Sequence, residues 1–361
     1  MQTPDANQSP RRRAWLRFRR NGLAMAGLGF IALMVLVALL GPWIRPDGTP
    51  QTNAQQIVLS NQSPGFTVEV VRLHKPNFTP ASFWETLAHY GAPEPYTEIA
   101  IQTATAEDGG LACTLYGSED KAFYSADQLY ALAPVSRRFL LGTDKFGRDL
   151  LSRLMAGTLI SLSVGLIAVG ISLLIGVVLG ALAGYFGGWV DRSIMWLINV
   201  IWSVPTLLLV LAMVFAFGKG FEKVFIAVGL TMWVEVARVV RGQILSLRER
   251  EYAQAARVLG YGHLRILFGH LLPGAWGPVI VISAANFASA ILIEAGLSFL
   301  GIGAQIPTPS WGNMIKEHYS YITTDLAYLA FIPGVMIMAL VLAFMLVGNG
   351  LRDALDVRAS G

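Results

Sequence analysis

Apolar blocks of about twenty residues constrain this chain more than any other feature of its sequence. A hydrocarbon core of roughly 30 Å needs about twenty residues of α-helix to cross it. The blocks occupy residues 22–44, 159–183, 194–217, 224–240, 279–297 and 326–347. Apolar residues make up 54% of the chain. Charged residues make up only 14%, a fraction well below that of a typical soluble domain. The sequence therefore predicts an all-α integral membrane protein with about six transmembrane helices.

The first block follows a strongly basic arm, residues 1–21, whose arginines lie between positions 11 and 20. Such a start resembles the basic flank of a secretory signal peptide. The block is longer than a signal peptide's apolar region of about 7 to 15 residues, and no small-x-small cleavage site follows it. We interpret residues 22–44 as an uncleaved transmembrane anchor, with a removed signal peptide as the alternative.

Arginine and lysine are distributed unevenly between the spans. The excess lies in the basic arm, in residues 238–265 and in the C-terminal tail, and by the positive-inside rule these segments face the cytoplasm. We therefore expect a multi-pass protein of the cell inner membrane with both termini in the cytoplasm. Residues 45–138, between the first two spans, are then extracytoplasmic.

The polar segment 45–138 predicts a small α+β domain inserted between the first two helices. Residues 66–73 and 97–106 are rich in β-branched side chains. The turn sequence at 107–110 separates the second of these from residues 111–116, which predicts a hairpin.

Capping patterns predict two short helices in the same domain. Thr79, which precedes a proline, begins a helix that ends at Gly91, and Ser125 with Gln128 forms a capping box for another. Cys113 is the only cysteine, so it has no disulfide partner within the chain. We expect it to be buried as a small hydrophobic residue.

Two features of the spans concern helix packing. Gly176, Gly180, Gly184 and Gly188 recur every four residues, which lines one helix face and lets another backbone approach closely. We favour packing inside this subunit over a dimer interface. Pro205 lacks an amide hydrogen and predicts a kink in the third span.

Three polar residues within the predicted spans are candidates for lining a transport pathway: Asn199, Glu235 and Asn286. A carboxylate in a span is costly and usually lines water or pairs with a base. Arg238 lies on the same helix face as Glu235 and offers such a pair, so both interpretations of Glu235 stay open. Glu294 is expected near the hydrated outer end of its span.

Motifs of catalysis are missing from the sequence. It contains no Gly-x-x-x-x-Gly-Lys-Ser/Thr loop, no His-Glu-x-x-His and no cysteine pair, and its five histidines are scattered. We therefore expect no catalytic residue, no metal site and no cofactor in this chain, which is not an enzyme. Energy for transport would come from ATP bound by another subunit.

The predicted cytoplasmic loop, residues 241–273, carries the most information. Residues 251–259 predict a short helix with small residues on one side, Gly260 permits a sharp reversal, and a second helix runs to Pro273. A helix with a small-residue face beside a glycine turn suits docking into a groove. An ordinary solvated loop helix is the alternative.

This loop resembles the signature of binding-protein-dependent importer permeases, which reads Glu-Ala-Ala, three residues, Gly, nine residues, Ile-x-Leu-Pro. The positions in step with it are Gln254, Ala255, Ala256, Gly260, Leu272 and Pro273. Glutamine replaces the glutamate of the pattern, and His270 replaces the isoleucine. The resemblance implies that the loop is the coupling helix seated on the ATP-hydrolysing subunit.

Other stretches resemble permeases of the dipeptide, oligopeptide and nickel group. These are residues 141–154 before the second span, 294–312 in an outer loop, and 350–356 in the tail. The basic arm with one early span resembles the C-type member of the permease pair. Residues 139–361 would then form the permease core, whereas the insert at 45–138 inherits nothing from the family.

The resemblance implies a permease subunit for peptides or similar small solutes that forms half of the translocation pathway. Its partners would be a second permease subunit, two ATP-binding subunits, an extracytoplasmic solute-binding protein and membrane lipid, with no nucleic acid. The alternative is a stand-alone channel or ion-coupled secondary transporter using Glu235 and Glu294. Such a carrier would not need the docking loop and usually has two related halves, which the sequence lacks. A membrane-embedded enzyme would need a nucleophile–base or metal arrangement.

Overall fold

The computed structural model describes residues 10–355 apart from 89, 219 and 306. It divides into two compact units. The helical unit comprises the described residues up to Met34, residues 161–303 and the described residues from Met336 on. The sheet unit comprises residues 35–160 and 304–335, again without 89 and 306. Three long helices run from one unit into the other: α2 Gly22–Ile44, α4 Leu150–Phe186 and α12 Tyr328–Leu355.

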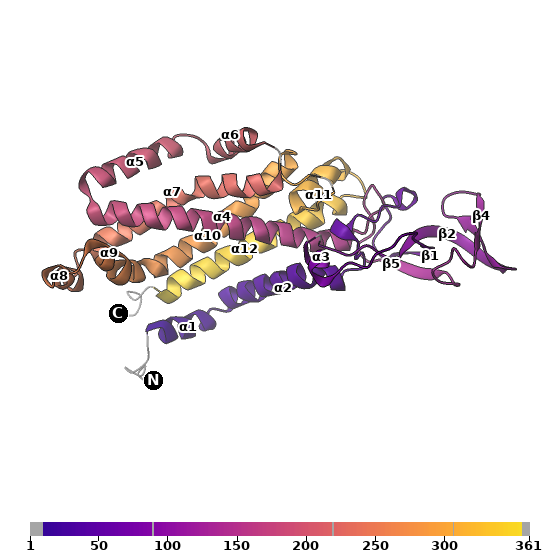
Figure 1. The fold of residues 1–361 in the computed structure, drawn as a ribbon, viewed down its shortest axis with the longest axis horizontal. Helices are drawn as coiled ribbons and strands as arrows, with labels where there is room; N and C mark the ends of the chain where they lie inside the picture. Colours follow the sequence, from indigo (N-terminus) through magenta and orange to yellow (C-terminus); the bar gives the residue numbers. More distant parts are fainter. Residues whose placement is uncertain (1–9, 89, 219, 306, 356–361) are drawn as a thin grey trace. The chain divides into compact units, whose positions relative to one another are not determined.

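The remaining helices belong mostly to the helical unit (Figure 1). They are α1 Pro10–Arg20, α5 Gly188–Trp202, α6 Thr206–Phe217, α7 Phe221–Leu247, α8 Glu251–Val258, α9 His263–Ile266, the π-helix η3 Leu267–Leu271 and α10 Leu272–Phe299. The sheet unit adds α3 Phe83–Ala88, α11 Trp311–His318 and the short 3-10 helices η1 Pro50–Thr52, η2 Ile57–Leu59 and η4 Tyr319–Tyr321.

Four helical segments among the described residues are long and apolar enough to cross a membrane: Gly22–Ile44, Leu150–Phe186, His263–Phe299 and Tyr328–Leu355. The bent pair α5 and α6 raises this number to five when it is counted as one span. The predicted span 224–240 lies within α7, whose charged residues, among them Glu235, Arg238 and Arg241, keep it outside this set. The count of six spans therefore stays a prediction.

The predicted third span, residues 194–217, is broken rather than merely kinked. Helix α5 ends at Trp202, α6 begins at Thr206, and the two are bent by 90°. Pro205 has φ −55° and ψ 128° and caps α6. Proline cannot donate to the preceding turn and disfavours helical geometry at the residue before it, here Val204. Both effects end α5 before the proline.

The glycine stripe of α4 packs against α7, as the spacing predicted. A Cβ at Gly176 would lie 2.6 Å from Cβ of Val236, and one at Gly180 would lie 2.4 Å from the carbonyl oxygen of Ala237. Gly184 meets α7 in the same way. The prediction is wrong for Gly188, which begins α5 at φ +52° with nothing near its Cβ position.

The sheet unit contains a five-stranded antiparallel sheet in the order β4-β3-β2-β1-β5 (Figure 1). The strands are β1 Phe66–His74, β2 Tyr96–Glu107, β3 Gly110–Leu115, β4 Lys121–Ser125 and β5 Val135–Phe139. The predicted hairpin is confirmed, because β2 pairs with β3 and Glu107 faces Gly110 at its closed end. Cys113 is 1% exposed in an apolar cluster with Ile101 and Leu129, as expected.

The two predicted short helices of this segment need correction. The first is only α3, Phe83–Ala88, and its capping box joins Ser82 to Glu85 rather than beginning at Thr79. At the second site the amide of Ser125 donates to Oε1 of Gln128 at 3.1 Å, but no helix follows. The chain turns there instead, and Leu129 pairs with Leu73 of β1. The capping hydrogen bond is therefore present, but it caps a turn and not a helix.

Candidate functional site: the loop at 249–273 and a polar pocket

The loop after α7 consists of two short helices joined by a glycine turn. Helix α8 ends at Val258, and Gly260 adopts φ +76°, a conformation that glycine occupies at little cost. The amide of Tyr261 donates to the carbonyl of Ala256 at 3.1 Å, which closes the end of the helix as in a Schellman motif. Chain direction therefore reverses at Gly260, where the sequence placed the turn.

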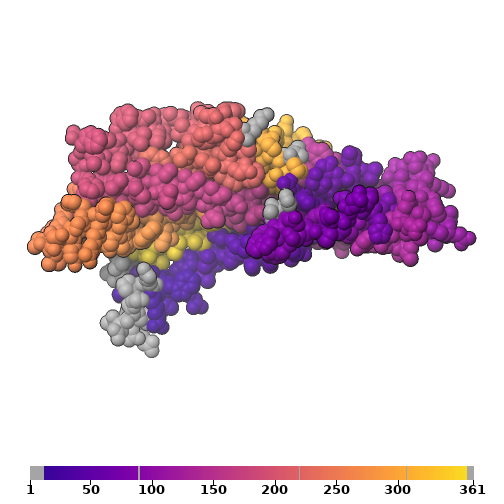
Figure 2. All heavy atoms as spheres, in the orientation of Figure 1, coloured from indigo at the N-terminus to yellow at the C-terminus, as the bar shows by residue number. Residues whose placement is uncertain are grey.

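The small residues of α8 do not all face outward. Ala253 and Ala256 are buried in an apolar cluster with Ile266, Leu267 and Leu271 of the same loop. Gln254 and Ala255 are exposed. The atoms of this loop, orange in Figure 2, lie at the surface of the molecule.

Large apolar side chains make the outward face of the loop. Val258 is 88% exposed, Leu259 71% and Leu264 63%. Ala255 is thus free to form part of a docking face, which stays a prediction, whereas Ala256 is buried and does not lie on the outward face. A helix of two turns must bury one of its sides to stay in place.

Contacts at the base of the loop attach it to the end of α4. Tyr185 Oη and His263 Nδ1 lie 2.9 Å apart, and Nη1 of Arg248 donates to the carbonyl of Gly184 at 3.0 Å. Leu272 is buried at the start of α10, and Pro273 occupies its first turn, where a missing amide hydrogen has no cost. His270, the departure from the family pattern, pairs its Nδ1 with the carbonyl of Arg265 at 3.1 Å.

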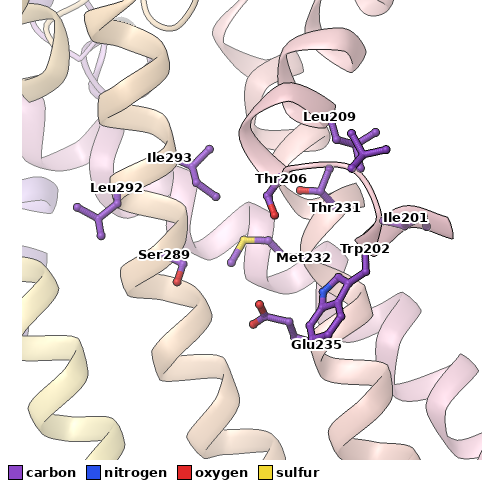
Figure 3. A pocket seen from close by; sticks show the side chains of 11 residues that line it. Ile201, Trp202, Thr206, Leu209, Thr231, Met232, Glu235, Ser289, Leu292 and Ile293 are labelled. Carbon is purple, nitrogen blue, oxygen red and sulfur yellow. The ribbon is translucent and has the colours of Figure 1, made fainter. Parts of the chain in front are cut away.

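A pocket of about 330 Å³ lies in the helical unit between the α5–α6 bend, α7 and α10 (Figure 3). The bend contributes Ile201, Trp202, Val204, Thr206 and Leu209, α7 contributes Thr231, Met232 and Glu235, and α10 contributes Ser289, Leu292 and Ile293. Glu235 is exposed, although its neighbours Val234 and Val236 on α7 are buried. Its carboxylate points toward α10, on the side of Ser289 (Figure 3).

The structure separates the three polar candidates. Asn199 accepts a hydrogen bond from Nη2 of Arg238 at 3.1 Å, and the guanidinium of Arg238 stacks 3.4 Å from the ring centre of Trp202. Among the described residues no ion pair joins Arg238 to Glu235. Asn286 is fully buried, and neither polar atom of its amide has a hydrogen-bond partner in the part that the structure describes. Glu235 alone of the three lines the pocket.

Glu294 also differs from expectation. It is 1% exposed on α10, and it accepts a hydrogen bond from Oγ of Ser298 at 2.6 Å.

Sequence reasoning missed a buried ionic network in the sheet unit. Arg148 donates from Nε to Asp144 at 2.6 Å and from Nη2 to Glu317 at 2.9 Å, and Arg153 lies within 3.8 Å of the same two carboxylates. Asp144, Glu317 and His318 are close enough to hold a cation. Because two arginines already neutralise the two carboxylates, we assign the group to folding.

The network joins two stretches that the sequence analysis treated separately. Residues 144–153 come before α4 or in its first turn, whereas Glu317 and His318 end α11. Trp311, which begins α11, donates from Nε1 to the carbonyl of Leu154 at 2.8 Å. Trp311 belongs to the stretch 294–312 that resembles the family, but Glu317 and His318 lie beyond it, so the sequence carried no signal for the ionic contact.

A helical subunit with apolar spans, a surface loop that reverses at a glycine, and a polar pocket between helices define a membrane transport component. Residues 176–361 match the family described as "Binding-protein-dependent transport system inner membrane component". Residues 9–64 match the "N-terminal TM domain of oligopeptide transport permease C". The chain belongs to the binding-protein-dependent transport family and is an inner membrane permease component.

Relatives with assigned names match over most of the chain. It is 33% identical to the di/tripeptide transport system permease protein DppC of Pseudomonas aeruginosa, over 96% of this chain and 92% of that protein. It is 43% identical to the glutathione transport system permease protein GsiD of Pectobacterium atrosepticum, over 60% of this chain and 71% of that one. Among solved structures, the inward-facing MetNI methionine ABC transporter aligns with 57% of this chain and 98% of its own chain, at 18% identity and a TM-score of 0.49.

Proposed function

We propose that this chain is one of two permease subunits in an ATP-driven importer for peptides or similar small solutes. The match along nearly the whole length of a di/tripeptide permease carries this proposal. Relatives named for oligopeptide and glutathione transport support the same solute class. The second permease, two ATP-binding subunits and a solute-binding protein outside the membrane would complete the importer.

Energy reaches the spans, in this proposal, through the loop at 249–273. Its outward face presents Ala255, Val258 and Leu259, an apolar surface suited to a groove on an ATP-binding subunit. The inner face of α8 packs on Leu267 and Leu271, which lead directly into α10. A push on α8 would thus be transmitted to a long apolar helix that lines the pocket.

The orientation follows from the same assignment. The coupling loop and both termini lie in the cytoplasm, and the sheet β1–β5 lies outside it. We assign the sheet an accessory role in docking the solute-binding protein or covering the pathway mouth. The surface of the sheet unit, not the helical unit, would then determine which binding protein is accepted.

Transport by the reconstituted importer tests the function. Proteoliposomes containing this subunit and the partner subunits encoded beside it should accumulate a labelled dipeptide when ATP and the binding protein are supplied. Ala255→Trp should release the ATP-binding subunits from the purified complex, because its side chain faces outward. Ser246→Trp, an exposed position of α7 outside the loop's docking face, is the control. ATP-dependent uptake that survives complete removal of this subunit would refute the proposal.

The role of the sheet can be tested separately. Phe66 pairs with Phe139, so residues 66–139 can be replaced by a short Gly-Ser linker between neighbouring ends. Residues 56–62 are kept in this deletion variant, because they pack closely on the motif before α4. A Cβ at Gly142 or at Gly147 would strike their backbone. We expect intact assembly but reduced uptake at limiting binding protein. Unchanged uptake would remove the accessory role.

A further inference from the structure

The pocket in Figure 3 holds a carboxylate that no cation of the described part of this subunit contacts directly. Glu235 is exposed into the pocket, and no ion pair with it occurs among the described residues. The nearest base on its helix face, Arg238, is engaged by Trp202 and Asn199. A carboxylate within a predicted span is expensive unless water or a counter-charge meets it.

Besides Glu235 and the indole N–H of Trp202, the polar side-chain groups of the pocket are hydroxyls that can accept hydrogen bonds. Thr231 donates its own hydroxyl proton to the carbonyl of Val228 at 2.8 Å, which leaves its oxygen lone pairs available to another donor. Thr206 and Ser289 add two further hydroxyls from different helices. The pocket therefore offers one anion and several acceptors to a ligand rich in donors.

The remaining lining is apolar and aromatic. Leu209, Met232 and Ile293 surround the polar groups, and Trp202 forms one wall (Figure 3). The volume of the pocket, about 330 Å³, is at the small end of the range for ligand pockets. Its lining residues include no histidine or cysteine, and the thioether of Met232 is the only sulfur among them, so they offer a soft divalent metal a single soft ligand.

We propose that Glu235 binds the terminal ammonium group of the transported solute as it passes through this pocket. This inference rests on the proposed function and adds to it the chemical group that the pocket recognises. An ammonium group carries one positive charge and three donors, which the carboxylate and two hydroxyls would satisfy together. Solutes with a free amino end would then be favoured over those whose amine is blocked.

Uptake of matched peptides by the complete importer tests this assignment. A labelled dipeptide and its N-acetylated form differ only in the ammonium group, and each is measured with the wild-type subunit and with Glu235→Gln. The ratio of variant to wild-type uptake is compared between the two peptides, so that any preference of the binding protein cancels. Glu222→Gln, a second exposed glutamate on α7 outside the pocket, is the matched control.

We expect Glu235→Gln to lower uptake of the free dipeptide roughly tenfold or more, the effect of losing a charge-assisted hydrogen bond. Uptake of the acetylated peptide should change by less than about twofold, and Glu235→Asp should retain the preference. An equal loss for both peptides, or loss of the second permease from the purified Glu235→Gln complex, would assign Glu235 to assembly and overturn the proposal. No loss for either peptide would also overturn it. A wild-type importer that transports neither peptide would instead refute the solute class, and the inference with it.

Discussion

Arg148 donates from Nη2 to Oε2 of Glu317 at 2.9 Å, across 169 positions of the chain. Both side chains are buried, at 0% and 5% exposure, and Asp144 occupies the other side of the same guanidinium. This contact fixes the start of α4 to the end of α11 within the sheet unit. A buried ion pair of this kind adds little net stability, but losing one partner leaves an uncompensated charge in the interior.

Arg148→Met should therefore destabilise the protein strongly, by about 3 to 5 kcal/mol, because it leaves Asp144 and Glu317 buried without their main counter-charge. The thermal unfolding midpoint of the detergent-purified subunit measures the loss. Glu249→Gln removes an ion pair with Arg248 in which the glutamate is 66% exposed, and should change stability by about 1 kcal/mol or less. Equal midpoints for the two variants would show that the buried network does not support the fold.

His318, beside this network, makes stability depend on pH. Burial lowers its pKa below the usual 6.5, although its Nδ1–H donates to the carbonyl of Met314 and Asp144 and Glu317 oppose the shift. Lys145 lowers the pKa further. Below about pH 6.5 the unfolded chain binds a proton that the folded chain does not, so stability is complete above this pH and falls on acidification.

We predict that the unfolding temperature decreases as the pH is lowered below about 6.5, and that His318→Gln flattens this part of the curve. His74→Gln, on the exposed end of β1, should keep the wild-type slope. Stability that rises on acidification, or a slope that His318→Gln leaves unchanged, would contradict the prediction.

Local sequence patterns predicted the helices and strands of this fold better than the contacts between segments that are distant in the sequence. The hairpin β2–β3 and the glycine stripe of α4 depend on neighbours in the sequence, so turn chemistry and spacing were sufficient. The buried pair Arg148–Glu317 depends on a contact between distant segments, which no local period reports. Pro205 was recognised as a disruption, but the 90° bend depends on what α5 and α6 pack against.

The candidate site divides in the same way. The motif at 254–273 predicted the glycine turn at Gly260, because the left-handed conformation has a local signature. It did not predict that Ala256 faces inward, since that side is chosen by packing on Leu267 and Leu271. The sequence identified Glu235 as a polar residue within a predicted span. Only the structure showed that Arg238 contacts Trp202 and Asn199 and forms no ion pair with Glu235.

The α4–α7 interface yields a prediction with an internal control. A valine at Gly180 would force its side chain into the carbonyl of Ala237, whereas nothing lies within 4 Å of a Cβ at Gly170 on the same helix. Gly180→Val should lose about 1 to 3 kcal/mol relative to Gly170→Val, since both share the same helix propensity. Thermal unfolding with size-exclusion chromatography measures the difference. Similar stability of both variants would mean that α4 and α7 do not pack closely.

The proposed orientation can be tested with single thiols. Cys113 is the only native cysteine, so Ser63→Cys and Ser246→Cys can be made one at a time in a Cys113→Ser background. Both positions are exposed, one in the sheet unit and one at the end of α7. In intact spheroplasts an impermeant maleimide should label Ser63→Cys alone, and permeabilised cells should label both. Labelling of Ser246→Cys alone in intact cells would reverse the orientation.

The last prediction concerns the glycine turn of the coupling loop. Gly260 and Gly262 both have open space where the Cβ of a larger residue would lie, but Gly260 adopts φ +76° and Gly262 adopts φ −62° with ψ 149°. Valine fits the second conformation, whereas in the first it is strained by about 1 to 2 kcal/mol or more. Gly260→Val should therefore displace α8 from α9 and abolish most ATP hydrolysis stimulated by the loaded binding protein, while the subunit still inserts and assembles. Gly262→Val should retain stimulation close to wild type. If both variants hydrolyse ATP normally, the loop at 249–273 does not couple the ATP-binding subunits to the spans.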